Sequence, residues 1–264
     1  MTNKKPKTQN EVVDQKSSSI VTWGPAASII VVVVIYIVSQ LIAALILSIY
    51  PALKHWSYSQ AQNWLSNSNY ASFILTLIVE TLVIFFLWLF LKHRKTTFKS
   101  IGLKDRPRLT DLGYILVGFA IYFLAYAVCL TLVQRLVPSL NVNIKQDIGF
   151  STSTVGNQLW LVFISLVILP PIAEEILFRG FMYTGLRTKL NKIVAALIVS
   201  VFFASLHLIE GQGGVLWVAG LDTFILSLVL IYLREKTDKL WASMGLHMVK
   251  NFIAFAALFL FHIG

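Results

Sequence analysis

The chain has 264 residues, of which 57% are hydrophobic and 13% charged; its net charge is +10 and its mean hydropathy +0.75. A soluble domain carries about a quarter charged residues, and several apolar runs here exceed the roughly 18 residues that can cross a bilayer as a helix. This composition excludes a soluble enzyme, a fibrous protein and a disordered chain. It predicts an all-α, polytopic transmembrane helical bundle.

The elements follow one another in a simple order. Residues 1–20 are polar and contain four lysines, which predicts a disordered cytoplasmic tail. Seven apolar runs are then predicted to span the membrane, at 24–49, 71–91, 112–136, 157–178, 193–209, 214–233 and 240–263. The only cysteine, Cys129, lies inside one of these runs, which excludes an intramolecular disulfide and a multi-cysteine metal site.

The basic residues fall mostly on one side of these spans. Of the 22 lysines and arginines, 18 lie in the tail or in the segments 92–110, 179–192 and 234–239, whereas the opposite loops contain only Lys54 and Lys145. Cytoplasmic loops carry an excess of basic residues. We therefore expect a multi-pass protein of the plasma membrane with its N-terminus in the cytoplasm. The positive charge indicates orientation in the bilayer and predicts no nucleic-acid partner.

Polar side chains inside the spans are few and costly. A charge at the centre of a span costs about 2.5–3.5 kcal/mol on insertion scales, so such residues are candidates for function. The candidates here are Glu80, Glu174, Glu175, Asp222, His207 and His247, with Asn251 as a polar neighbour.

The densest group follows the proline pair Pro170 and Pro171. Glu175 and Arg179 are four residues apart, so on a helix they lie on one face and can pair. Glu174 is rotated by about 100° from Glu175 and does not share that face. The two prolines remove backbone donors and predict a kink, whose carbonyls need polar surroundings.

Two histidines can reach this group. Glu174 and His207 lie at about equal distances before and after the turn near residue 190, so a helical hairpin would place them at the same depth. His247 and Asn251 share a helix face. Glu174, His207 and His247 would suit a Zn²⁺ or other divalent metal site with an open position, or a base and oxyanion donors around a water. Alternatively, each histidine is a buried side chain bonded to a neighbouring helix.

These residues carry a family resemblance. The patterns Glu174-Glu175-x-x-x-Arg179, Phe203-x-x-x-His207 and His247-x-x-x-Asn251 resemble the ordered signatures EExxxR, FxxxH and HxxxN/D of the CPBP intramembrane proteases, also called the Abi or type II CAAX prenyl endopeptidase family. Ile101-Gly102-Leu103 resembles the usual lead-in to this region. The resemblance covers about residues 100–255.

The resemblance implies an intramembrane endopeptidase acting on a membrane-embedded or lipidated protein or peptide substrate in the lipid bilayer. Glu174 would activate water, His207 would orient that water or bind a metal, and His247 with Asn251 would stabilise the oxyanion. Glu175 and Arg179 would shape the site. Relatives are linked to bacteriocin self-immunity, so the resemblance also implies this role.

The resemblance sets further expectations for the architecture. It divides the chain into the tail 1–20, N-terminal helices and a basic loop at 21–110, and a catalytic helical core at 111–264. The family has eight helices, so an additional segment is expected within 137–156 or 209–222. Straight spans place His207 and His247 in opposite halves of the membrane, and a cavity mouth on the cytoplasmic side is favoured.

Two other functions fit the same residues. A non-proteolytic immunity or regulatory protein could keep the fold and bind a partner. A proton-coupled transporter would also use embedded carboxylates, but we find no paired halves with matching broken helices.

Overall fold

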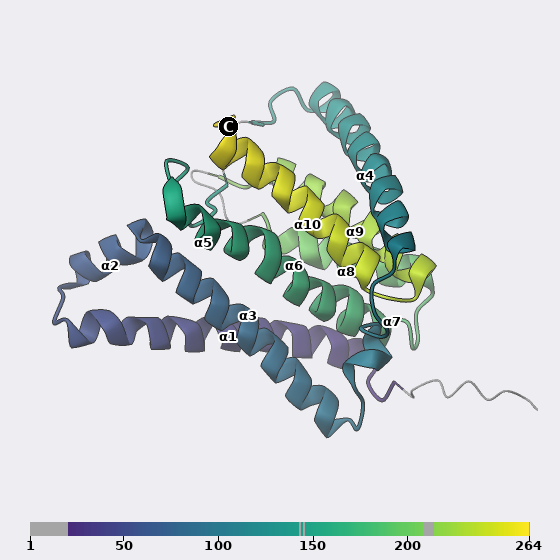
Figure 1. The fold of residues 1–264 in the computed structure, drawn as a ribbon. Helices are drawn as coiled ribbons and strands as arrows, with labels where there is room; N and C mark the ends of the chain where they lie inside the picture. The colour runs from purple at the N-terminus through teal and green to yellow at the C-terminus, as the bar shows by residue number, and fades with distance from the viewer. Residues whose placement is uncertain (1–20, 143, 145, 209–213, 264) are drawn as a thin grey trace, which may run out of the picture.

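The computed structural model describes residues 21–142, 144, 146–208 and 214–263, and within these ranges it is a helical bundle (Figure 1). The predicted tail 1–20 and the first part of the expected segment 209–222 lie outside the described residues. Six helices in the described part are long and apolar enough to cross a membrane: Pro25–Leu53, Asn69–His93, Leu109–Leu136, Gly156–Leu186, Trp217–Thr237 and Trp241–Leu260. The predicted multi-pass helical bundle is therefore confirmed.

The N-terminal part is a helical hairpin with a short helix at its tip. It consists of α1 (Pro25–Leu53), α2 (Tyr58–Asn67) and α3 (Asn69–His93). Pro25 suits the first turn of α1 because that turn needs no backbone donor there. Ser57 and Gln60 form a capping box at the start of α2, and Ser68 caps α3. The separate helix α2 was not predicted from the sequence.

A connection on the basic side leads into the second half of the bundle. It contains the 3₁₀ turn η1 (Phe98–Ile101) and ends at α4 (Leu109–Leu136). Gly102 has a φ of +99°, which favours glycine. The turn between α9 and α10 is bound to this connection, since Leu240 N donates to Gly102 O at 3.1 Å.

The fourth membrane-spanning segment, Gly156–Leu186, changes helical register several times. Its parts are η2 (Gly156–Gln158), α5 (Leu159–Phe163), the π-helical η3 (Ile164–Ile168), α6 (Leu169–Glu174), the π-helical η4 (Glu175–Met182) and α7 (Tyr183–Leu186). Pro170 and Pro171 lie between the two π-helical parts, where they cannot donate to carbonyls of the preceding turn. Arg179, counted among the loop cations from sequence, is instead buried within this segment.

The last helices complete the bundle. They are α8 (Lys192–Leu206), α9 (Trp217–Thr237) and α10 (Trp241–Phe255), which continues as the π-helical η5 (Ala256–Leu260). With 15 residues, α8 is shorter than the predicted span 193–209 and rises about 22 Å. Between α4 and η2 the described residues form turns, so the eighth helix expected within 137–156 is absent from that described part.

The largest buried core joins α1, α3, the fourth segment and α8. Its completely buried members include Val32, Leu87, Phe181, Leu186 and Val199. At Gly185 an added Cβ would collide with Trp23 and Ser28, so the glycine permits close approach of α1 and α7. This packing fixes the segment that carries the two adjacent glutamates.

Candidate active site

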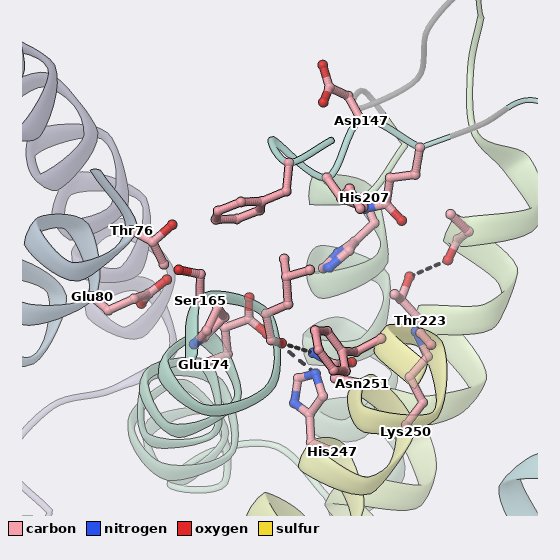
Figure 2. Close-up of a pocket in the computed structure, with 18 of the residues that line it drawn as sticks. Thr76, Glu80, Asp147, Ser165, Glu174, His207, Thr223, His247, Lys250 and Asn251 are labelled. Carbon is pink, nitrogen blue, oxygen red and sulfur yellow. Dashed lines mark hydrogen bonds and ion pairs between the residues drawn. The ribbon is translucent and has the colours of Figure 1, made fainter. Parts of the chain in front are cut away.

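A cavity of about 340 Å³ lies among α1, α3, the fourth segment, α9 and α10 (Figure 2). Four of the six predicted site residues line it: Glu174, His207, His247 and Asn251. The other two, Glu175 and Arg179, are completely buried beside it. The three sequence motifs therefore meet at one place.

Glu175 connects two of these motifs. Its Oε1 lies 3.0 Å from Arg179 Nη1 and 3.2 Å from His247 Nδ1. The predicted pairing of Glu175 with Arg179 is confirmed, although both residues lie in a π-helical stretch. A carboxylate that is ionised only accepts hydrogen bonds, so it fixes the orientation of the His247 ring from behind.

The Phe203 ring contacts the Arg179 guanidinium and the imidazole rings of both histidines. The Arg179 guanidinium lies 4.2 Å from the Phe203 ring centroid, and the rings of His207 and His247 lie 4.8 and 6.0 Å from it. Phe203 is 1% exposed. A buried guanidinium is stabilised by an aromatic face. The aromatic residue of the second motif thus positions members of all three motifs.

Glu174 faces the cavity beside His247. Its Oε2 lies 3.7 Å from His247 Nε2, which places the imidazole between the two adjacent glutamates. Glu174 and His207 line the same cavity, as the equal hairpin arms predicted. The depth difference expected between His207 and His247 does not separate them, since both rings lie near the Phe203 ring and line one cavity.

The His207 ring has a defined hydrogen-bonding role. Its Nδ1 lies 3.0 Å from the carbonyl oxygen of Phe203. A carbonyl oxygen only accepts, so Nδ1 carries the proton and Nε2 of the neutral ring keeps a lone pair. His207 can therefore accept a hydrogen bond, or bind a cation, at Nε2.

Asn251 binds a backbone carbonyl that the proline pair leaves without a donor. Its Nδ2 donates to the carbonyl oxygen of Leu166 at 2.9 Å. That carbonyl is four residues before Pro170, which has no backbone N–H to offer it. The predicted need for polar surroundings at the kink is met by the third motif. The amide group has a second hydrogen for a further bond.

Several polar lining residues belong to none of the motifs. Lys250 Nζ lies 2.9 Å from Asp222 Oδ2, and Asp222 also accepts a hydrogen bond from Tyr122. Glu80 of α3 lines the cavity on the side opposite His247. Glu80 and Asp222 were already candidates because they are acids inside predicted spans. Lys250 was not predicted; its position three residues after His247, on nearly the same helix face, could have indicated it.

The predicted metal ligands do not form a metal site as placed. Among the described residues, no three histidine, cysteine, aspartate or glutamate side chains gather closely enough to hold an ion. Glu174, His207 and His247 share the cavity but not a common coordination point. Metal binding by these residues stays a prediction.

The cavity extends to the loop after α4. Gln146 and Asp147 of that loop line it and are exposed to solvent. This loop is at the end of the bundle opposite the basic connections, where the sequence has only Lys54 and Lys145 outside the helices. The orientation of the chain in the membrane stays a prediction, and so does the expected cytoplasmic mouth.

The arrangement is that of a multi-pass membrane protein with a polar cavity among its helices. Residues 156–253 match the family model of type II CAAX prenyl endopeptidase Rce1-like proteins. This match contains all three motifs and confirms, over that segment, the predicted family resemblance. Over residues 156–253 the chain is therefore similar to CAAX-protease-like membrane proteins.

Two curated proteins are similar to the chain. One, described as an uncharacterized protein of Mycoplasma capricolum subsp. capricolum, is 26% identical over 202 residues, which are 72% of this chain. The other, the UPF0177 protein YbdI of Lactococcus lactis subsp. lactis, is 28% identical over 115 residues, which are 44% of this chain. In both cases the match spans 57% of the relative's length. No solved structure matches.

Proposed function

We propose that the chain is an intramembrane endopeptidase that hydrolyses a peptide bond of a membrane-associated or lipidated protein with water activated by Glu174. The observation that carries the proposal is the convergence of Glu174, His207, His247 and Asn251 on one cavity. The Rce1-like family match supports it. Peptide hydrolysis needs a base for water and donors for the developing oxyanion, and this cavity contains both kinds of group.

Water activation uses two acceptors. A water molecule donates one hydrogen to the Glu174 carboxylate and the other to Nε2 of His207, whose Nδ1 is bonded to the Phe203 carbonyl. As the water oxygen attacks the peptide carbonyl carbon, its proton passes to Glu174. The result is a tetrahedral intermediate with a negative oxygen.

Helix α10 supplies the donors for the developing oxyanion. Asn251 has a second amide hydrogen beyond the one given to Leu166, and His247 is a donor there when its Nε2 carries a proton. These groups stabilise the oxyanion. When the carbon–nitrogen bond breaks, Glu174 returns the proton to the leaving amine, so the products are a carboxylic acid and an amine.

The substrate is a membrane-embedded or lipidated segment, since the cavity lies within the helical bundle. The proposed reaction requires no nucleic-acid partner. If such a substrate were a bacteriocin or its receptor, cleavage would produce the self-immunity implied by the family resemblance.

A cleavage assay tests the proposal. Protein purified in detergent would be incubated with a lipidated peptide and with a transmembrane peptide, and products would be identified by mass spectrometry. We expect Glu174→Gln to lower kcat by at least 10²-fold, the usual scale of a lost general base, and His207→Ala to lower it strongly as well. Cys129→Ala, in α4 away from the cavity, is the matched control and should retain activity.

Two results would contradict this assignment. If Glu174→Gln and His207→Ala cleave as well as the unaltered chain, these residues are not catalytic. If both variants lose a cellular immunity phenotype while no cleavage is detected with the unaltered chain, the protein acts by binding a partner. Metal analysis of active, dialysed protein decides whether an ion takes part.

A further inference from the structure

The cavity is closed toward the basic end of the bundle. Immediately after Glu175, the residues Phe178, Arg179, Phe181 and Met182 are each no more than 1% exposed. The connection from α3 to α4 packs directly on this layer, because a Cβ at Gly180 would lie 3.2 Å from the backbone oxygen of Ile101. A continuous packed layer therefore separates the cavity from the basic loops.

A second contact strengthens this seal. Ile101 and Leu240 are completely buried, and the backbone of Leu240 is bonded to that of Gly102. Trp241 Nε1 also lies 3.2 Å from the carbonyl oxygens of Lys104 and Asp105. The α9–α10 turn and the basic connection thus pack together under the site.

At its other end, the cavity reaches solvent-exposed residues in the described part of the chain. Asp147 and Gln146 are exposed and line the same cavity as Glu174. In Figure 2, Asp147 and His207 lie at one end of the cavity, and Glu174 and His247 lie deeper. Helix α8 rises only about 22 Å, less than a hydrocarbon core of about 30 Å, and His207 at its end lines the cavity.

The charges of the loops indicate which face this is. The closed end carries the connection after α3 and the turns after α7 and α9, which are rich in lysine and arginine, while the open end has almost none. Basic loops remain in the cytoplasm. The open end is accordingly the non-cytoplasmic face.

We propose that the candidate site receives its substrate from the non-cytoplasmic face. The substrate class is then a segment of an exported or membrane protein exposed on that face, rather than a lipidated C-terminus held at the cytoplasmic leaflet. That a substrate enters at all rests on the proposed function, whereas the side of entry rests on the packing and charge described above.

Cysteine labelling in intact cells tests the side of entry. In a Cys129→Ala background, Asp147→Cys probes the mouth, Thr223→Cys probes the buried lining, and Lys99→Cys probes the opposite exposed end. Each variant is treated with a small membrane-impermeant thiol reagent before and after permeabilisation. We expect Asp147→Cys and Thr223→Cys to react fully in intact cells, and Lys99→Cys to react at least tenfold more after permeabilisation.

Each other outcome overturns the proposal. Labelling of Asp147→Cys only after permeabilisation places the mouth in the cytoplasm, and labelling of Lys99→Cys in intact cells places the basic end outside. Reaction of Asp147→Cys without reaction of Thr223→Cys, in protein that elutes as a folded species, means that the mouth is closed. Labelling does not depend on catalysis, so a failure to cleave peptides would count against the proposed function alone.

Discussion

Arg179 and Glu175 carry opposite charges where neither side chain reaches solvent. Their atoms lie 3.0 Å apart, but the geometry is not that of a good hydrogen bond, and the three guanidinium nitrogens have no hydrogen-bond partner in the described structure. Removing one member of a buried pair leaves the other charge uncompensated. The pair therefore matters more for folding than its single close contact indicates.

Arg179→Met should destabilise the protein by about 3–5 kcal/mol, because it leaves the Glu175 carboxylate buried without its cation. Thermal unfolding in detergent measures this. The double variant Arg179→Met, Glu175→Gln should recover part of the loss, since the uncompensated charge is gone. Equal melting temperatures for the single variant and the unaltered chain would show that the pair does not stabilise the fold.

At the scale of elements, the proline pair and the last helix depend on each other. Asn251 of α10 bonds the Leu166 carbonyl that Pro170 leaves without a donor. A buried acceptor left unsatisfied costs about 1–3 kcal/mol. The break in the fourth segment is thus stabilised by a side chain that also faces the cavity.

A double-mutant cycle tests this dependence. Asn251→Ala should cost about 1–3 kcal/mol in the unaltered chain and less in Pro170→Ala, where a backbone N–H can replace the amide. Unfolding free energies of the four proteins give the coupling. Strictly additive losses would mean that the amide and the proline act independently.

A second element-scale feature is the ionic contact between the basic connection and the α9–α10 turn. The hydrogen bond and charge of Lys239 hold the pKa of Asp105 below its ordinary value of 3.8. Partial burial acts to raise the pKa of Asp238, but the hydrogen bonds from Lys104 and Arg234 outweigh it and leave the pKa lowered. Both carboxylates therefore favour the folded state when they are ionised.

This contact predicts a dependence of stability on pH. Since both folded-state pKa values are depressed, the stabilisation is present above pH 3.8 and is lost as the pH falls through the lower folded values. Melting temperatures between pH 7 and pH 3 should fall less steeply for the Asp105→Asn, Asp238→Asn variant than for the unaltered chain. Parallel curves would exclude a contribution from these two groups.

The sequence allowed much of this arrangement to be predicted, for identifiable reasons. Apolar runs placed the spans, and helix spacing correctly paired Glu175 with Arg179. Helix lengths were less predictable: α8 ends early and α2 forms in a loop, because tertiary packing and capping by Ser57 decide these boundaries. The contact of Glu175 with His247 joins residues 72 positions apart, and no local pattern predicts such a distance.

At the scale of the whole molecule, the chain as a whole is basic whereas the lining of the cavity is mainly acidic. The chain has a net charge of +10, yet the ionisable residues other than histidine that line the cavity are four acids and one lysine: Glu80, Asp147, Glu174, Asp222 and Lys250. Lys250 is paired with Asp222. A cleft with low-dielectric walls lined mainly by one sign of charge concentrates ligands of the opposite sign.

The proposed peptidase should therefore prefer cationic segments. For two peptides of equal length and hydropathy, one with lysines and one with glutamates beside the cleaved bond, we expect about tenfold higher kcat/KM for the lysine peptide at low salt. Asp147→Lys, at the exposed mouth, should reduce this ratio, whereas Lys99→Gln on the opposite end should leave it unchanged. Added salt should diminish the preference because it screens charges at the mouth. Equal kcat/KM values for the two peptides at low salt would show that the acids inside the cavity serve the reaction and the fold without selecting the substrate.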